Sequence, residues 1–177
     1  MVLASRSDAE HDSFAVLAME IPPESMAERP ARILALDFGT RNIGLAVTDE
    51  LGLTAQGLPT LRRGNKRSDL DHLRRLIRQY GVSELVMGLP LRMSGEQGVQ
   101  AEKVQAFAEE LRHKFKLPVH LFDERLTSVE ANRLLRETDM SIRRRAEVVD
   151  RMAAVLILQS FLEAQKARTG SAADLHE

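Results

Sequence analysis

Carboxylate side chains occur at three places in the sequence where a fold could bring them together. Asp37 follows a short apolar run, Asp123 and Glu124 follow another, and Asp150 lies in the opening turns of an expected final helix. In sheets flanked by helices, ligands tend to bind at strand ends. If the first and last strands are neighbours, Asp37 and Glu124 converge there, and the final helix could supply Asp150 as a third ligand.

Such a cluster favours one kind of chemistry. Clustered carboxylates repel one another, which raises their pKa values and destabilises the fold unless a cation neutralises them. The chain has no cysteine, and its hard oxygen donors suit Mg²⁺ or Mn²⁺ rather than zinc. Two such ions roughly 3.5–4 Å apart would clamp the attacking and leaving oxygens of a phosphodiester. The pattern therefore predicts a nuclease site.

Small residues near Asp150 support its approach to the sheet. Ala153 and Ala154 are three and four positions further on, which puts them on the same face of a helix as the aspartate. We expect these small side chains to let the final helix lie close to the sheet, so that a short carboxylate reaches a strand end.

Each acid also has a simpler structural interpretation. Acidic residues are common as caps and dipole partners at strand ends and helix starts, and for Asp37, Glu124 or Asp150 alone that interpretation is the better one. Asp123 could hydrogen-bond its own turn. It is the combination of acids that favours catalysis.

Basic residues provide candidate contacts to a phosphate backbone. We expect Thr40 and Arg41, which follow the first acid, and Arg125, which follows the acidic pair, to contact the substrate. Aromatic residues make up only 4% of the chain, which does not support recognition of single strands by base stacking. A wider basic rim could also bind the phosphate backbone, although runs of charged residues are more often solvated faces. Its members are Arg62, Arg63, Lys66, Arg67 and Arg143 to Arg145.

Length and charge bound the organisation of the chain. Its 177 residues suffice for one domain with a hydrophobic core, and no apolar run approaches the roughly 20 residues that cross a bilayer. The net charge of −1 is unevenly spread, because the first 30 residues have a net charge of −4 and the last ten −1, which leaves +4 for residues 31–167. We expect a flexible acidic tail over 1–30, a domain over 31–167 and a second flexible tail over 168–177.

Hydrophobic periodicity predicts the elements that position the acids. Three short strands are expected first, in an antiparallel meander because their connections are too short for a helix: 33–36, 43–48 and 55–61. A helix then buries Leu70 and Leu73, with Ser68 as its N-cap and Gly81 just after its end. The remaining expected elements are a strand over 84–88, a long helix around 104–115, a strand over 117–122, a helix from Thr127 and a final helix over 146–167 preceded by the basic run 143–145.

This order of elements indicates an α/β fold. Three leading antiparallel strands, followed by alternating helices and strands, favour a mixed five-stranded sheet whose last two strands are parallel and whose faces are covered by helices.

Four ordered motifs resemble a known family. They are the segments 34–46 (LALDFGTRNIGLA), 86–90 (VMGLP) and 123–128 (DERLTS), and Asp150 followed by 153–159 (AAVLILQ). Over about residues 31–167 the chain resembles the bacterial YqgF (RuvX) family, Holliday-junction-resolvase-like proteins described as nucleases for the 5′ end of pre-16S ribosomal RNA. The resemblance implies a ribonuclease H-like fold, a cytoplasmic location and a role in ribosome biogenesis.

The resemblance also assigns roles to the acids. Family acidic positions correspond to Asp37, Glu124 and Asp150, with Asp123 as a further metal ligand. We expect Asp37 to bridge two Mg²⁺ or Mn²⁺ ions, Glu124 and Asp150 to complete one site each, and a metal-activated water to attack the phosphorus. The implied substrate is structured precursor rRNA, the protein is expected to be a monomer or a weak homodimer, and no membrane partner is expected.

Three alternatives remain open. Branched DNA is a possible substrate, although resolving a four-way junction generally requires a dimer. The second alternative is a non-catalytic nucleic-acid-binding module of the same fold, but the presence of all three acids disfavours it. The segment 37–40 also resembles the first phosphate loop of actin-like sugar kinases and chaperone ATPases, but those enzymes need two such domains and this chain has room for one.

Overall fold

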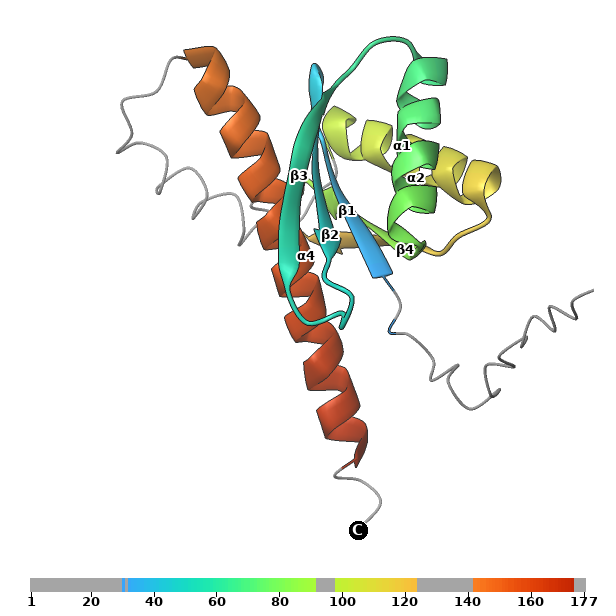
Figure 1. Ribbon diagram of the computed structural model, residues 1–177, viewed down its shortest axis with the longest axis vertical. Coiled ribbons are helices and arrows are strands. Elements are labelled where there is room, and N and C mark those ends of the chain that lie inside the picture. The colour runs from blue at the N-terminus through green and yellow to red at the C-terminus, as the bar shows by residue number, and fades with distance from the viewer. Residues whose placement is uncertain (1–29, 31, 92–97, 124–141, 174–177) are drawn as a thin grey trace, which may run out of the picture.

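The computed structural model describes residues 30, 32–91, 98–123 and 142–173 (Figure 1). In that part of the chain, strands form one sheet and helices pack on both of its faces. The elements are β1 (Arg32–Phe38), β2 (Asn42–Thr48), β3 (Ala55–Arg62), α1 (Lys66–Tyr80), β4 (Val82–Leu89), α2 (Val99–Phe115), β5 (Val119–Asp123) and α4 (Ile142–Ala173). The helix expected from Thr127 lies outside the described residues.

The sheet is mixed, with five strands in the order β3-β2-β1-β4-β5 among the described residues. β2 pairs antiparallel with both β1 and β3, whereas β4 pairs parallel with β1 and β5. This confirms the expected α/β class and the antiparallel meander. The first and last strands are not neighbours, however, because β4 lies between them. One edge of β1 is taken by β2, so the crossover through α1 returns the chain to the free edge of β1, and β5 then adds outside β4.

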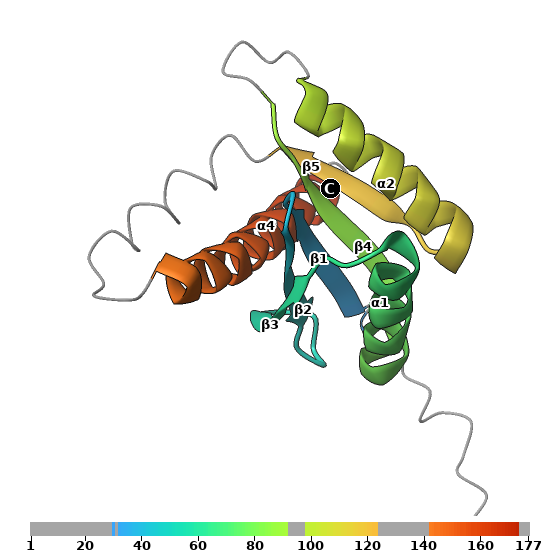
Figure 2. The same ribbon diagram turned by 90° about the horizontal axis from the view of Figure 1, so that it is seen from above.

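Helices cover the two faces unequally. α1 and α2 lie on one face, and the long α4 crosses the other (Figures 1 and 2). Alternation along β1 distributes its side chains between two hydrophobic clusters: Leu34 and Leu36 face α1 and α2, whereas Ile33 and Ala35 face α4. The same alternation places Asp37 on the α4 face.

The start of α1 differs from the expected one. Asn65 is the N-cap, and its side chain accepts a hydrogen bond from the backbone N–H of Ser68 at 2.9 Å. Ser68 lies inside the helix, and its hydroxyl donates to the carbonyl of Asn65. The prediction of Ser68 as the cap was wrong, because both residues are good caps and the earlier one takes the role. The end was predicted correctly, since Gly81 adopts the left-handed conformation with φ of 62°.

The final helix is longer than expected. α4 already begins at Ile142, so the basic run 143–145 lies inside the helix rather than before it. Arginine is a good helix former, and nothing in this segment interrupts the helix. Asp150 is consequently in the third turn and not in the opening turns. No helix in the described part of the chain is long and apolar enough to span a bilayer.

Candidate active site

Asp37 and Asp150 come together on the α4 face of the sheet. Asp37 lies near the end of β1 and is half-buried, and Asp150 is carried by α4. Burial, and secondly the negative charge of Asp150, raise the pKa of Asp37 from 3.8 to about 6. The dipole of a helix N-terminus acts only within the first turn, so the cap interpretation does not apply to Asp150. The two carboxylates instead form an electrostatically coupled pair.

Gly44 permits this approach. In the β1–β2 ladder Gly44 is directly opposite Asp37, and a Cβ added to it would lie 1.9 Å from the backbone carbonyl oxygen of Asp150. The helix backbone therefore rests directly on β2 beside the first acid. Ala154 is fully buried in the same interface, but the closest approach is at the glycine. Sequence reasoning missed Gly44, although a glycine inside a strand often marks a close backbone approach.

Asn42, at the start of β2, contacts the second acid directly. Its side-chain amide donates a hydrogen bond to Oδ2 of Asp150 at 2.8 Å. This bond links the strand beside β1 to the third turn of α4 and orients the carboxylate of Asp150. The sequence carried no signal for it, because the two residues are far apart in the chain.

The turn after Asp37 is tightly built. The backbone N–H of Gly39 donates to the carbonyl of Asn42 at 3.0 Å, and a Cβ on Gly39 would lie 2.8 Å from that same oxygen. Thr40 and Arg41, the two expected substrate contacts in this turn, are exposed at its tip. The turn therefore presents both side chains to solvent beside the paired acids.

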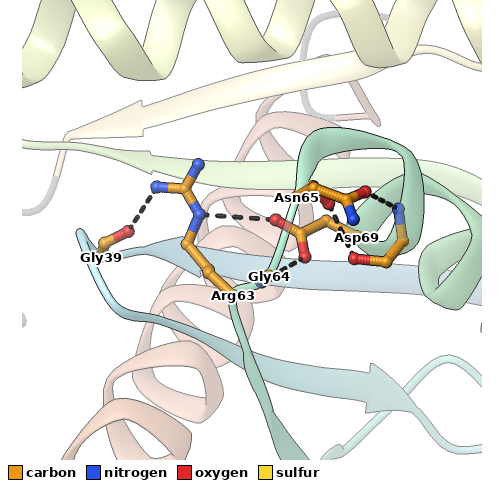
Figure 3. A network of polar contacts seen from close by, with 6 residues as sticks. Gly39, Arg63, Gly64, Asn65 and Asp69 are labelled. Atoms are coloured by element: carbon orange, nitrogen blue, oxygen red, sulfur yellow. Dashed lines mark hydrogen bonds and ion pairs between the residues drawn. The ribbon is translucent and has the colours of Figure 1, made fainter.

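Arg63 holds this turn from the side of α1 (Figure 3). Its Nη1 donates to the carbonyl of Gly39 at 3.0 Å, and its guanidinium lies 4.3 Å from the ring centroid of Phe38. The Nε atom is 3.6 Å from the buried carboxylate of Asp69, which also accepts a hydrogen bond from the backbone of Gly64. Arg63 therefore supports the turn, which is a different role from the expected rim contact to a phosphate backbone.

A second contact to the turn comes from α2. The side-chain amide of Gln100 donates to the carbonyl of Phe38 at 3.0 Å. The carbonyl of Phe38 is thus bound from α2, and the carbonyl of Gly39 is bound from the connection between β3 and α1. The strand end that carries Asp37 is fixed by hydrogen bonds to Gln100, to Arg63 and within its own turn.

Asp123, the described acid at the end of β5, does not join the pair. Leu121 packs on the cluster under α1 and α2, and Phe122 packs on the cluster under α4. Alternation therefore places Asp123 on the opposite face of the sheet from Asp37. Glu124 and Arg125 lie outside the described residues. Within the described part of the chain, no three or more histidine, aspartate or glutamate residues group so that they could hold a metal ion.

The paired acids nevertheless suit a divalent cation. They offer hard carboxylate oxygens of the type that Mg²⁺ and Mn²⁺ prefer. Burial and mutual repulsion make the charged form of Asp37 unfavourable, and a nearby cation would relieve both effects. This raised pKa is the structural evidence that the donor set fits a cation.

The chain is similar to known proteins over most of its length. A family model described as "RuvX: Holliday junction resolvase" matches residues 31–164. A protein of Koribacter versatilis named "Putative pre-16S rRNA nuclease" is 64% identical over 132 residues, which cover 75% of this chain and 86% of the relative. A relative of the same name from Moorella thermoacetica is 56% identical over 132 residues, covering 75% of this chain and 94% of its own.

Among solved structures, RuvC of T. thermophilus in complex with a Holliday junction substrate matches 79% of this chain and 96% of its own, with a TM-score of 0.48 and 14% identity. The match to the Fowlpox virus resolvase with its substrate junction DNA covers 76% of this chain and 98% of the resolvase chain, with a TM-score of 0.47 and 13% identity. The family match spans most of the chain, and these two curated relatives are more than half identical to it over the aligned residues. The chain therefore belongs to the RuvX family.

Proposed function

We propose that this protein is a metal-dependent endonuclease that hydrolyses phosphodiester bonds in the 5′-end processing of pre-16S rRNA in the cytoplasm. The observation that carries the proposal is the pairing of Asp37 with Asp150, two acids far apart in the sequence, at a half-buried strand end where the pKa of Asp37 is raised. The names of the curated relatives support the choice of RNA as substrate.

Three acids would hold two Mg²⁺ or Mn²⁺ ions. Asp37 and Asp150 supply two of the ligands. Asp123 lies on the opposite face of the sheet from Asp37, so Glu124 is the proposed third ligand. When bound, such ions activate a water for attack and stabilise the leaving oxygen.

The chain's own residues orient these acids and the substrate. The amide of Asn42 holds Oδ2 of Asp150, which leaves the carboxylate little freedom to rotate away from Asp37. The exposed Thr40 and Arg41 would contact phosphates next to the scissile bond. Arg125 keeps the same proposed role from the segment outside the described residues.

The test is cleavage of a precursor 16S rRNA in Mg²⁺ or Mn²⁺. Asp37→Asn and Asp150→Asn should each lower the rate by about a hundredfold or more, because each removes charge that stabilises the transition state. Glu163→Gln, an exposed acid further along α4, is the matched control and should cleave at the wild-type rate. Cleavage that survives both aspartate substitutions unchanged would show that the paired acids are not the site.

Four-way DNA junctions should be tested in parallel, because the family model is described as a Holliday junction resolvase. We expect the precursor RNA to be cleaved faster. Faster cleavage of the junction would replace RNA by branched DNA as the substrate, and RNA binding without any cleavage would indicate a non-catalytic binding module.

A further inference from the structure

α1 and α2 cover the sheet face opposite α4 (Figure 2), and a basic groove lies between these two helices. It encloses a volume of about 520 Å³. The residues that α1 contributes repeat at intervals of three and four positions, so one face of this helix forms a wall, and α2 contributes from the other side. The lining residues are Lys66, Arg67, Leu70, Asp71, Arg74 and Lys114. We refer to this feature as the α1–α2 groove.

Its cations are only partly neutralised. Arg74 pairs with Asp71, and Lys66 pairs with Glu110 of α2 at 2.9 Å. Arg67 and Lys114 are exposed, and neither makes an ion pair or hydrogen bond with another described residue. Two positive charges without a partner among the described residues therefore line the groove, and a polyanion would meet an attractive potential there.

The groove begins close to the turn that follows Asp37, on the opposite face of the sheet from the paired acids. α1 starts at Lys66, three positions after Arg63, whose guanidinium binds the turn that follows Asp37. From Lys66 to Arg74 the helix rises by about 12 Å. A nucleic-acid strand that advances about 3.4 Å per nucleotide passes roughly three phosphates over that length.

We propose that the α1–α2 groove binds the phosphate backbone of the RNA substrate beyond the point of cleavage. The inference rests on the proposed nuclease function, because it takes the substrate strand to leave the site past Gly39 and Arg63. The groove supplies charge without an array of donors aimed at base edges, so it positions the strand and does not read its sequence. An acidic protein segment is the less favoured occupant, because α1 starts three positions after Arg63, which binds the turn that follows Asp37.

The experiment measures RNA affinity against salt concentration, without divalent cations so that no cleavage occurs. The double variant Arg67→Gln/Lys114→Gln removes the two unpaired cations. The control Arg75→Gln/Arg78→Gln removes the same charge from exposed positions of α1 that do not line the groove. Thermal unfolding should be similar for both variants, because all four side chains are exposed.

We expect the groove variant to bind a structured precursor rRNA about tenfold more weakly than wild type, with the slope of log affinity against log salt reduced by about 1.5. The control should change affinity by less than about twofold. Wild-type affinity in the groove variant, or equal losses in both variants, would overturn the proposal. The proposal would also be overturned if the groove variant lost affinity only for inorganic phosphate or poly-glutamate and still bound RNA with the wild-type affinity.

The design separates this proposal from the nuclease proposal. Cleavage by the groove variant should fall at RNA concentrations below its Kd, because its substitutions weaken binding of the RNA. If wild type binds RNA through the groove and no cleavage occurs, the nuclease proposal fails and the groove proposal holds. If wild type cleaves RNA and the groove variant shows unchanged affinity, the groove proposal alone fails.

Discussion

The pairing of Asp37 with Asp150 has an energetic consequence that depends on pH. Burial first, and the charge of Asp150 second, raise the pKa of Asp37 to about 6 in the folded protein, against 3.8 in the unfolded chain. The folded state therefore binds the proton of the Asp37 carboxyl more tightly than the unfolded chain does. The stability that this protonation contributes is fully present below about pH 4 and is lost as the pH rises through about 6. The difference in pKa corresponds to about 3 kcal/mol.

Replacing this carboxyl by an amide should reverse that loss. Without divalent cations and above about pH 6, Asp37→Asn should unfold with a free energy up to about 3 kcal/mol higher than wild type, because the amide carries no charge to bury. Below about pH 4 the two proteins should differ little. Urea unfolding at several pH values measures this difference, and a difference that stays constant from about pH 4 to about pH 7 would contradict the raised pKa.

At the scale of elements, the site depends on how closely α4 lies on β2. The contact is between the backbone of the helix and a strand position without a side chain. The hydrogen bond from Asn42 to Asp150 lies beside it and needs the same short separation. On the other side of the sheet, Arg63 and Gln100 fix the turn that follows β1. Each acid is therefore positioned by neighbouring elements as well as by its own.

Gly44→Ala should separate α4 from the sheet. The new methyl group would overlap the carbonyl oxygen of Asp150, so we expect a loss of about 3 kcal/mol in the free energy of unfolding and a large loss of cleavage. Gly81→Ala is the matched control: it has open space around it and only the strain of a positive φ, which costs about 1 kcal/mol. Urea unfolding and cleavage assays of both variants test this, and equal losses of stability would contradict the close approach.

At the scale of the whole molecule, the candidate site joins the two ends of the domain. β1 and β2 come from the start of the sheet, and α4 returns after β5 to pack on β1, β2 and β3. A cation bound by Asp37 and Asp150 would therefore connect the first strand to the last helix. Such a ligand stabilises the folded state as a whole, because the unfolded chain does not hold the two acids together.

Mg²⁺ should accordingly raise the melting temperature. At a free concentration of about a hundred times its Kd, the cation adds about 2.7 kcal/mol to the stability of wild type, which corresponds to about 5–10 °C for a domain of this size. Asp37→Asn and Asp150→Asn should show little increase, whereas the Arg75→Gln/Arg78→Gln variant should respond like wild type. Thermal unfolding with Mg²⁺ and with a chelator measures the effect, and an equal increase in all variants would rule out a cation at the paired acids.

Local pattern was enough to predict most of the secondary structure. All five strands and α2 were expected close to their observed positions, because alternating or continuous apolar residues report burial directly. The boundaries that failed were those with competing local signals. Asn65 and Ser68 can both cap a helix, and the basic run 143–145 reads equally well as a connection or as the first turns of α4.

The sequence by itself determined which residues could do chemistry and in which elements they lie: the acids, the absence of cysteine and the order of strands and helices. Only the tertiary structure decided that β4 separates β1 from β5 and that Asp37 and Asp123 lie on opposite faces of the sheet. It also decided that the backbone of Asp150 packs on Gly44 and that the carboxylate of Asp150 accepts a hydrogen bond from Asn42. The reason is physical. Periodicity reflects the burial of each residue along its own element, whereas contacts between distant segments depend on which strand edges remain free and how closely two backbones can pack.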